Sequence, residues 1–390
     1  MLLEYLGAYK NKLSNKINGV IHIKTRENKV GSVLLSFITG PFTLTPKERF
    51  TDPHTNYWVC PEIARLFLEK GFDVDIINWD NKTFLPKKKY DVCVDLQHNI
   101  ERLEPVLGDK CKRVMFIISS YPEFQNNAEE KRLNDLFQRR GVRLSFGRKE
   151  DYSKNVQFTD FIGGYGNKTV RSSYPDFIKD KIVPIPVPSM DIYDAPKNKD
   201  YDKVRKNFLW FGGGGAILKG LDLIVEAFAD LPQLNLSLIG PAPFEEEFAK
   251  TYEKELSLPN IKRHNRPRIN ESGVAMIDDI PLEDIISESA FVIGLSASEG
   301  GGAATVQAMQ LGLIPITTPQ TGINEEAPGF VIHEPTLANI KKLILEVSTM
   351  YETDLKKLSY DTWNFAHTNH SKKAFTKKFN EFIDQIVNTQ

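Results

Sequence analysis

A run of four glycines, 212–215, stands where an apolar strand is expected to end and a helix to begin. Glycine lets a backbone approach a ligand closely, and the first turn of a helix attracts anions. Lys219, just before the helix, adds a positive charge suited to a phosphate. The pattern is not a Walker A loop, because Gly220 follows the lysine, and its glycine spacing differs from the dinucleotide motif GxGxxG. Gly213, Gly214 and Lys219 are therefore candidates to bind a phosphate; the alternative is a flexible turn with a surface lysine.

A second glycine run follows an acidic residue. Glu299 comes after the apolar segment 290–295, and the glycines lead into a helix expected over 303–311. A carboxylate accepts hydrogen bonds from sugar hydroxyls, and the free N–H groups of a helix start attract an anion. The alternative is a loop whose carboxylate is favoured by the helix dipole alone. The candidate ligand-binding residues of this motif are Glu299, Gly300, Gly301, Gly302, Ala303, Thr305 and Gln307.

Strands that alternate with helices must position both motifs. Apolar runs predict strands over 32–39, 72–78, 90–96, 113–119, 207–211, 234–239, 290–295 and 313–317. Helical periodicity predicts helices over 56–70, 129–140, 220–230, 303–311 and 371–388. Such alternation indicates parallel sheets covered by helices on both faces, in which ligands bind beyond the carboxyl ends of the strands. Both glycine motifs lie at such strand ends.

The length of 390 residues predicts two domains rather than a single core. Four prolines within 182–201 interrupt any regular element there. We therefore expect an N-terminal Rossmann-like domain over 1–185, a linker over 186–201 and a C-terminal Rossmann-like domain over 202–390. The amphipathic helix 371–388 is a segment that could pack back on the first domain.

Composition excludes several classes of protein. Fifty Lys and Arg balance 51 Asp and Glu, so the chain is not built to coat nucleic acid. Three cysteines without CxxC spacing encode neither a disulfide framework nor a zinc site. The absence of a long apolar run and of a signal-peptide pattern predicts a cytoplasmic protein. Residues 1–19 form an amphipathic pattern within a basic first fifty residues, which predicts a helix that packs on the first domain or touches an anionic membrane surface.

The two glycine motifs resemble those of the retaining, nucleotide-sugar-dependent glycosyltransferases of family 4, which have the GT-B fold: two Rossmann-like domains that face each other across a cleft. The similarity covers about residues 205–330 and includes Lys219-Gly220, Glu299 with Gln307 eight positions later, and Gly312. It implies that the first motif binds the donor diphosphate, and that Glu299 and Gln307 bind the sugar and the ribose. It also implies a glycan, lipid-linked glycan or small glycoside as acceptor, and no metal or other cofactor. Asp73 and Asp75, which resemble a metal-binding DxD, fall in the middle of a strand.

Two positions depart from the pattern of this family. Gly214 stands where the family usually has an arginine, so a cation for the diphosphate must come from elsewhere; the basic run 262–268 is one candidate. Gln307 replaces a second glutamate, although its amide can still bind ribose hydroxyls.

Candidates for the acceptor side lie in the first domain, near strand ends. They are Gly40, His54, His98, Ser119 and Tyr121. The family often has a functional histidine near Ser119; since none is present there, His98 is a displaced candidate for a catalytic role, or a structural histidine. A sugar-nucleotide-binding subunit without turnover is the main alternative function, and the glycine spacing argues against a nicotinamide-dependent oxidoreductase. The sequence indicates no oligomeric state.

Overall fold

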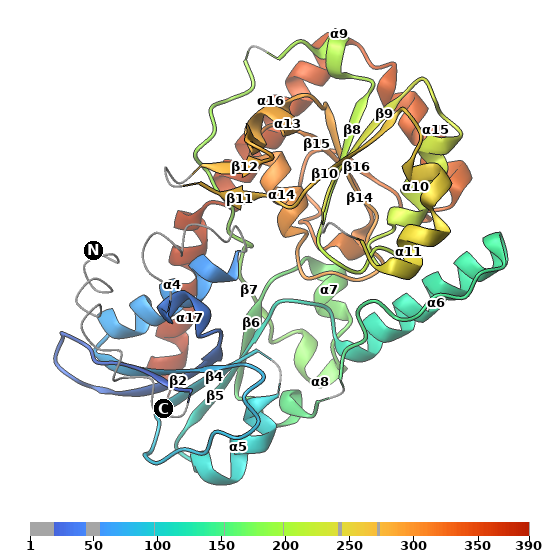
Figure 1. Ribbon diagram of the computed structural model, residues 1–390. Helices are drawn as coiled ribbons and strands as arrows, with labels where there is room; N and C mark the ends of the chain where they lie inside the picture. The colour runs from blue at the N-terminus through green and yellow to red at the C-terminus, as the bar shows by residue number, and fades with distance from the viewer. Residues whose placement is uncertain are drawn as a thin grey trace.

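The computed structural model describes residues 19–43, 55–96, 98–151, 153–197, 199–240, 244–270 and 274–389. They form two open α/β sheets, one in each half of the chain (Figure 1). In spatial order the first sheet consists of β1 (Ile21–Ile23), β3 (Phe72–Asn78), β2 (Gly31–Phe37), β4 (Val92–Asp95), β5 (Lys112–Ile117), β6 (Phe161–Gly164) and β7 (Val183–Pro184). The second consists of β10 (Ile261–His264), β9 (Asn235–Ile239), β8 (Asn207–Phe211), β14 (Phe291–Gly294), β15 (Ile314–Thr317) and β16 (Phe330–Val331).

The first sheet is buried on both faces because its central strands are apolar throughout. On β2, Val33, Leu35 and Phe37 face α4 (Asn56–Glu69) and α17 (Lys372–Asn388), whereas Leu34 faces α5 (Asn99–Leu107). Successive side chains of a strand point to opposite faces, so the apolar side chains of β2 pack against helices on both faces of the sheet. All pairs in the sheet are parallel except the one between β1 and β3.

The second sheet is wholly parallel and is covered in the same way. One face packs on α10 (Leu221–Ala229) and α15 (Leu337–Ser348), and the other on α13 (Leu282–Ser287) and α14 (Ala303–Met309). A small antiparallel sheet consists of β11 (Arg268–Ile269), β12 (Ala275–Ile277) and β13 (Ile280–Pro281). The shorter elements are α2 (Gly40–Thr43), η2 (Asn155–Phe158), α7 (Lys168–Ser172), α8 (Asp176–Lys179), α9 (Tyr201–Val204), α11 (Glu246–Thr251), α12 (Glu253–Leu256) and η3 (Pro319–Thr321).

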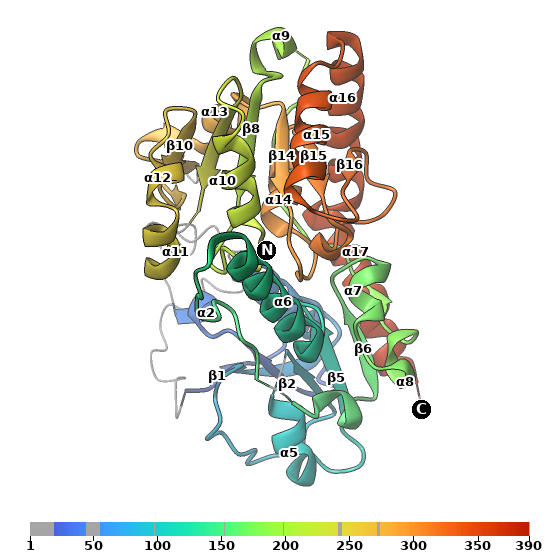
Figure 2. The ribbon, with the colours of Figure 1, turned by 90° about the vertical axis from the view of Figure 1, so that its right-hand side faces the viewer.

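The chain passes between the domains twice, and the two passages lie side by side. The backbone N–H of Ser189 donates to the carbonyl of His370 at 2.9 Å. Helix α16 (Glu352–Asn369) lies along the second domain and ends just before His370. After His370, α17 returns to the first domain, where Phe375 and Phe379 are fully buried (Figure 2). The proline-rich segment supplies the edge strand β7 before it crosses to the second domain, and an edge strand tolerates the missing N–H of proline.

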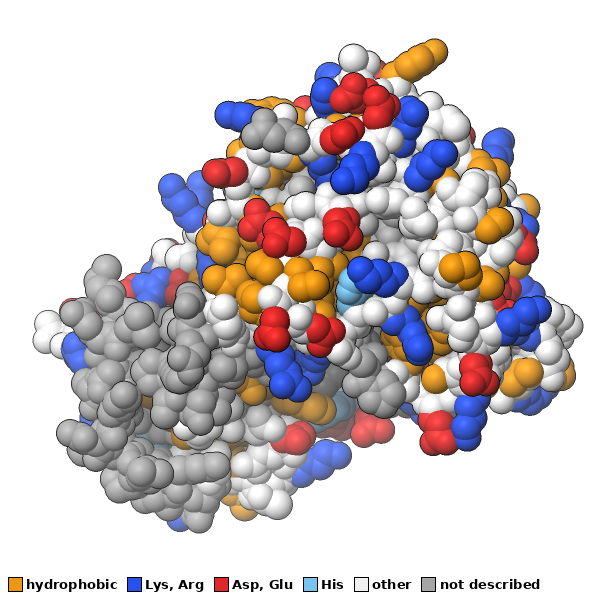
Figure 3. Space-filling view, turned by 45° about the horizontal axis from the view of Figure 1, so that its top comes forward, with side chains coloured by type: hydrophobic (Ala, Val, Ile, Leu, Met, Phe, Trp, Pro, Cys, Tyr) orange, Lys and Arg blue, Asp and Glu red, His pale blue; other side chains and the backbone are white. Residues whose placement is uncertain are grey.

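The strands expected from the sequence are present, with ends that differ by up to two residues. The helix expected over 129–140 is longer: α6 (Pro122–Arg140) begins at a proline, which suits the first turn of a helix. The expected N-terminal helix and His54 lie in segments outside the described residues. No helix among the described residues is long and apolar enough to cross a membrane. On the face drawn in Figure 3, Lys and Arg side chains are interspersed with Asp and Glu.

Candidate functional site

The first glycine turn follows β8. It is tightly packed at Gly220, where α10 begins, and open at Gly213, near β8. A Cβ atom at Gly220, whose φ is 71°, would lie 2.5 Å from the carbonyl oxygen of Leu295, so α10 can begin beside the end of β14 only with glycine there. At Gly213, by contrast, no described atom lies within 4 Å of the corresponding position. The turn therefore combines a rigid base with open space into which a ligand can fit.

The two motifs meet in an ion pair. The Nζ atom of Lys219 lies 2.6 Å from Oε1 of Glu299, and the hydroxyl of Ser296 donates to Oε2 at 2.7 Å. Only 11% of the Lys219 side chain and 24% of the Glu299 side chain are exposed. Burial raises the pKa of Glu299, but the charge of Lys219 and the two hydrogen bonds outweigh it, so the pKa lies below its ordinary value. Glu299 is therefore a carboxylate at neutral pH.

The second glycine run joins the domains. A Cβ atom at Gly300 would collide with the backbone of Ile118, and one at Gly301 with the side chain of Val187. The hydroxyl of Ser120 donates to the carbonyl of Glu299 at 3.2 Å. The loop after β5 of the first domain thus lies directly against the Glu299 loop, as two facing strand-end loops should. Ala303 and Thr305 follow in α14, with Thr305 buried against Gly294.

Gln307 lies on α14 and contacts the linker. Its Oε1 accepts a hydrogen bond from the backbone N–H of Met190 at 3.0 Å, while its Nε2 is buried and has no partner among the described residues. The amide oxygen therefore holds the linker, and the buried amide nitrogen keeps an unused donor group.

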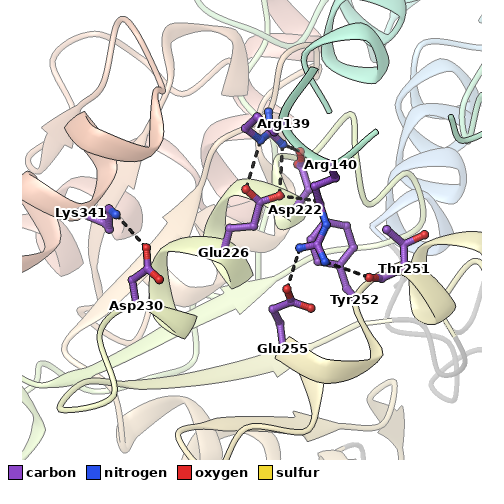
Figure 4. Close-up of polar contacts among 9 residues, drawn as sticks. All are labelled: Arg139, Arg140, Asp222, Glu226, Asp230, Thr251, Tyr252, Glu255 and Lys341. Carbon is purple, nitrogen blue, oxygen red and sulfur yellow. Dashed lines mark hydrogen bonds and ion pairs between the residues drawn. The ribbon is translucent and has the colours of Figure 1, made fainter. Parts of the chain in front are cut away.

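Helix α6 belongs to the first domain but docks on the second, which the sequence did not reveal. Arg139 pairs with Asp222 at 2.6 Å and with Glu226 at 3.1 Å, and Arg140 pairs with Glu255 at 2.6 Å (Figure 4). Arg132 donates to the carbonyl of Leu295 at 2.9 Å. Burial raises the pKa of Asp222, and the nearby arginines oppose that rise. These contacts join α6 to α10, to α12 and to the residue that follows β14.

A carboxylate accepts a hydrogen bond from one backbone N–H group of the glycine turn. Oε1 of Glu245 accepts a hydrogen bond of 2.5 Å from the backbone of Gly215. The loop after α6 lies on the same glycine, and a Cβ atom there would be 2.6 Å from Cγ and Cδ of Arg148. Neither Glu245 nor Arg148 was expected from the sequence, because both are far from the turn along the chain.

The remaining first-domain candidates are only partly brought together. The carbonyl of Ser119 accepts a hydrogen bond from the hydroxyl of Tyr174 at 2.9 Å, and the Tyr121 ring lies 5.4 Å from the Tyr174 ring. Gly40 begins α2 beside the hydroxyl of Tyr57. His98 lies at the N-cap of α5, with its ring 6.4 Å from that of Trp79. Among the described contacts, the 118–120 segment reaches Glu299 and its loop, whereas His98 does not.

The structure gives Asp73 and Asp75 structural partners. Asp73 pairs with Lys29 at 2.7 Å, and Asp75 accepts hydrogen bonds from His22 and Tyr90. Over the ranges that the structure describes, no three His, Cys, Asp or Glu side chains are grouped so that they could hold a metal ion. Of the basic run 262–268, the first residues lie on the edge strand β10.

Comparisons with known proteins agree with this arrangement. Residues 197–359 match the family model of glycosyl transferases group 1, and no curated protein matches the chain. Sucrose-phosphate synthase from Thermosynechococcus elongatus is 11% identical, with a TM-score of 0.59 over 93% of this chain and 99% of that one. HepE from Anabaena, solved with UDP-glucose, is 12% identical, with a TM-score of 0.56 over 91% of this chain and 100% of that one. A glycosyltransferase from Rickettsia africae is 13% identical, with a TM-score of 0.54 over 93% of this chain and 100% of that one. At these identities the likeness shows the fold, which is GT-B.

Proposed function

Taking the chain as a GT-B protein whose second half matches the group 1 glycosyltransferases, we propose that it transfers a sugar from a nucleotide-diphospho-sugar to a hydroxyl group of an acceptor. We further propose that transfer proceeds with retention of configuration and without a metal ion. The observation that carries the proposal is the Lys219–Glu299 ion pair beside the open turn at Gly213.

The ion pair supplies the two kinds of group that such a donor requires. A diphosphate that enters at Gly213 would attract the ammonium group of Lys219, and Glu299 would then accept hydrogen bonds from sugar hydroxyls. Departure of the nucleoside diphosphate places negative charge on phosphate oxygens, which Lys219 and the backbone N–H groups of the turn would stabilise. In this scheme the leaving phosphate helps to remove the proton of the acceptor hydroxyl, so no side chain acts as nucleophile.

The acceptor would approach from the first domain. The hydroxyl of Ser120 reaches the Glu299 loop, so the loop after β5 lies beside the proposed position of the sugar. The docking of α6 on α10 holds the domains close together and would exclude water, which otherwise hydrolyses the donor. A glycan, a lipid-linked glycan or a small glycoside fits the requirement for a hydroxyl.

A second candidate function is a sugar-nucleotide-binding subunit without turnover. Two observations favour it. The side-chain oxygen of Gln307 accepts a hydrogen bond from the linker, and Glu245 accepts one from the N–H of Gly215. Both contacts must change or be tolerated before a donor binds in the way proposed.

Thermal shift with a panel of nucleotide sugars, followed by assay of nucleoside diphosphate release, distinguishes the two functions. A bound donor raises the apparent stability by an amount that grows with the logarithm of its concentration relative to its Kd. We expect one donor class to raise the melting temperature, and an acceptor to accelerate release of the nucleoside diphosphate. Binding without release on any acceptor would favour the subunit, and no shift with any nucleotide sugar would contradict both functions.

A further inference from the structure

We propose that Arg148, which belongs to the first domain, binds the donor diphosphate across the domain interface. This inference rests on the proposed function. It assigns a role to a residue that lies 64 or more positions before the glycine turn and outside the domain that holds the turn.

The backbone around Arg148 is held firmly. Its N–H and that of Gly147 donate to the buried carboxylate of Glu129, at 3.1 and 2.7 Å to Oε1. Its carbonyl accepts a hydrogen bond from the side chain of Gln125 at 2.8 Å. Both Gln125 and Glu129 lie on α6, the helix that docks on the second domain. The position of Arg148 is therefore fixed by the same helix that closes the interface.

The side chain of Arg148 lies on the glycine turn. Its Cγ and Cδ atoms cover Gly215, whose φ of 88° and lack of a side chain leave room for them. Among the described residues, the hydrogen bonds of Arg148 are all made by its backbone, so the guanidinium remains available. Its charge acts on Glu299 and contributes to the lowered pKa of that carboxylate. The guanidinium is thus close to both motifs of the donor site.

The charges around the turn require a second cation. Lys219 is paired with Glu299, and Glu245 adds a negative charge at Gly215. A nucleoside diphosphate brings at least two further negative charges, which Lys219 alone cannot balance. A guanidinium presents a planar fork that binds phosphate oxygens in pairs, and Arg148 offers it from the opposite domain. Donor affinity would therefore depend on closure of the two domains.

The test compares binding of a nucleoside diphosphate with binding of the matching monophosphate. UDP, ADP and GDP are titrated by calorimetry into the full-length protein to find which one binds, and that nucleotide is then titrated into Arg148→Ala, Arg148→Lys and Lys149→Ala. Lys149 is the matched control, because it is an exposed cation next in the chain whose side chain lies over the ring of Phe146.

For Arg148→Ala we expect the Kd of the diphosphate to rise about tenfold to a hundredfold, and that of the monophosphate less than about threefold. Arg148→Lys keeps the stem over Gly215 and should recover part of the affinity, and Lys149→Ala should stay within about twofold of the wild type. Equal Kd values for Arg148→Ala and Lys149→Ala would overturn the assignment while leaving the proposed function intact. Failure of the wild type to bind any nucleoside diphosphate would instead overturn the proposed function, and this assignment with it.

Discussion

The ammonium group of Lys219 lies 2.6 Å from a carboxylate oxygen of Glu299, although 80 residues separate them along the chain. Without a ligand, the cation proposed for the diphosphate and the anion proposed for the sugar neutralise each other. A donor would divide the pair, because its phosphates compete for Lys219 and its hydroxyls for Glu299. Each partner should therefore influence the ionisation of the other.

Replacement of Lys219 should weaken donor binding and shift its pH dependence. In Lys219→Ala the largest effect that lowers the pKa of Glu299 is lost, while burial still raises it. Protonation of Glu299 then begins at a higher pH, so the acidic limb of donor binding should move upward. Calorimetric titration of the donor between pH 4 and 8 measures this, with Lys250→Ala as control because that lysine forms an exposed pair on α11. An acidic limb that does not move would show that Lys219 does not control Glu299.

Two glycines of the first turn should respond differently to alanine. Gly213→Ala adds a methyl group to open space and should leave the melting temperature unchanged while it weakens donor binding at least about fivefold. Gly220→Ala places a Cβ atom against Leu295 at positive φ and should destabilise the fold by about 1 to 3 kcal/mol. Calorimetry and thermal melts of both variants test this pair. Normal donor affinity in Gly213→Ala would mean that the open side of the turn does not hold the ligand.

The interdomain ion pair should contribute far more to stability than an exposed pair nearby. Arg139→Ala leaves Asp222, which is fully buried, without its closest cation and should cost about 3 kcal/mol of unfolding free energy. Lys341→Ala removes the exposed pair with Asp230, also drawn in Figure 4, and should cost less than about 1 kcal/mol. Urea unfolding at neutral pH compares them. Equal costs would indicate that α6 does not latch the two domains together.

Stability should fall in mild acid because of His370. Burial lowers its pKa from 6.5 to about 4, although its hydrogen bond with the carbonyl of Val187 opposes this. Since the unfolded chain binds a proton at a higher pH than the folded chain, stability is complete above about pH 6.5 and declines as the pH falls toward 4, by about 3 kcal/mol in all.

Thermal melts of the wild type and of His370→Gln between pH 7.5 and 4.5 test this expectation. The melting temperature of His370→Gln should fall less with pH than that of the wild type. The melting temperature of His333→Gln, which alters an exposed histidine, should fall as much as that of the wild type. An identical decline in His370→Gln would assign the acid sensitivity to other groups.

The sequence predicted the sheets better than the contacts between them. Apolar runs such as β3 and β8 have local signals, so their limits agree with the structure to the residue. The start of α6 was missed because its polar composition gives little helical periodicity. The motifs of Lys219 and Glu299 could be placed at one edge of a sheet because both follow strands, but their ion pair was not predicted.

The contribution of the first domain to the site could not be predicted in the same way. Arg148 and Glu245 reach Gly215 through tertiary packing, and no spacing along the chain marks them. Likewise, the contact of Gln307 with Met190 depends on where the linker crosses α14. The basic run 262–268 is conspicuous in the sequence as a source of an additional cation, whereas the cation that we propose, Arg148, is held by α6 and has no such local signal.

The acceptor-dependent rate of nucleoside diphosphate release by Glu299→Ala tests the central claim most directly. With the donor found by thermal shift, we expect the rate to fall at least about a hundredfold, while thermal melts still show a cooperative transition that is lowered only by the loss of the ion pair with Lys219. Glu283→Ala, which removes an exposed carboxylate from α13, should keep the wild-type rate. A wild-type rate in Glu299→Ala would contradict the assignment of the donor site.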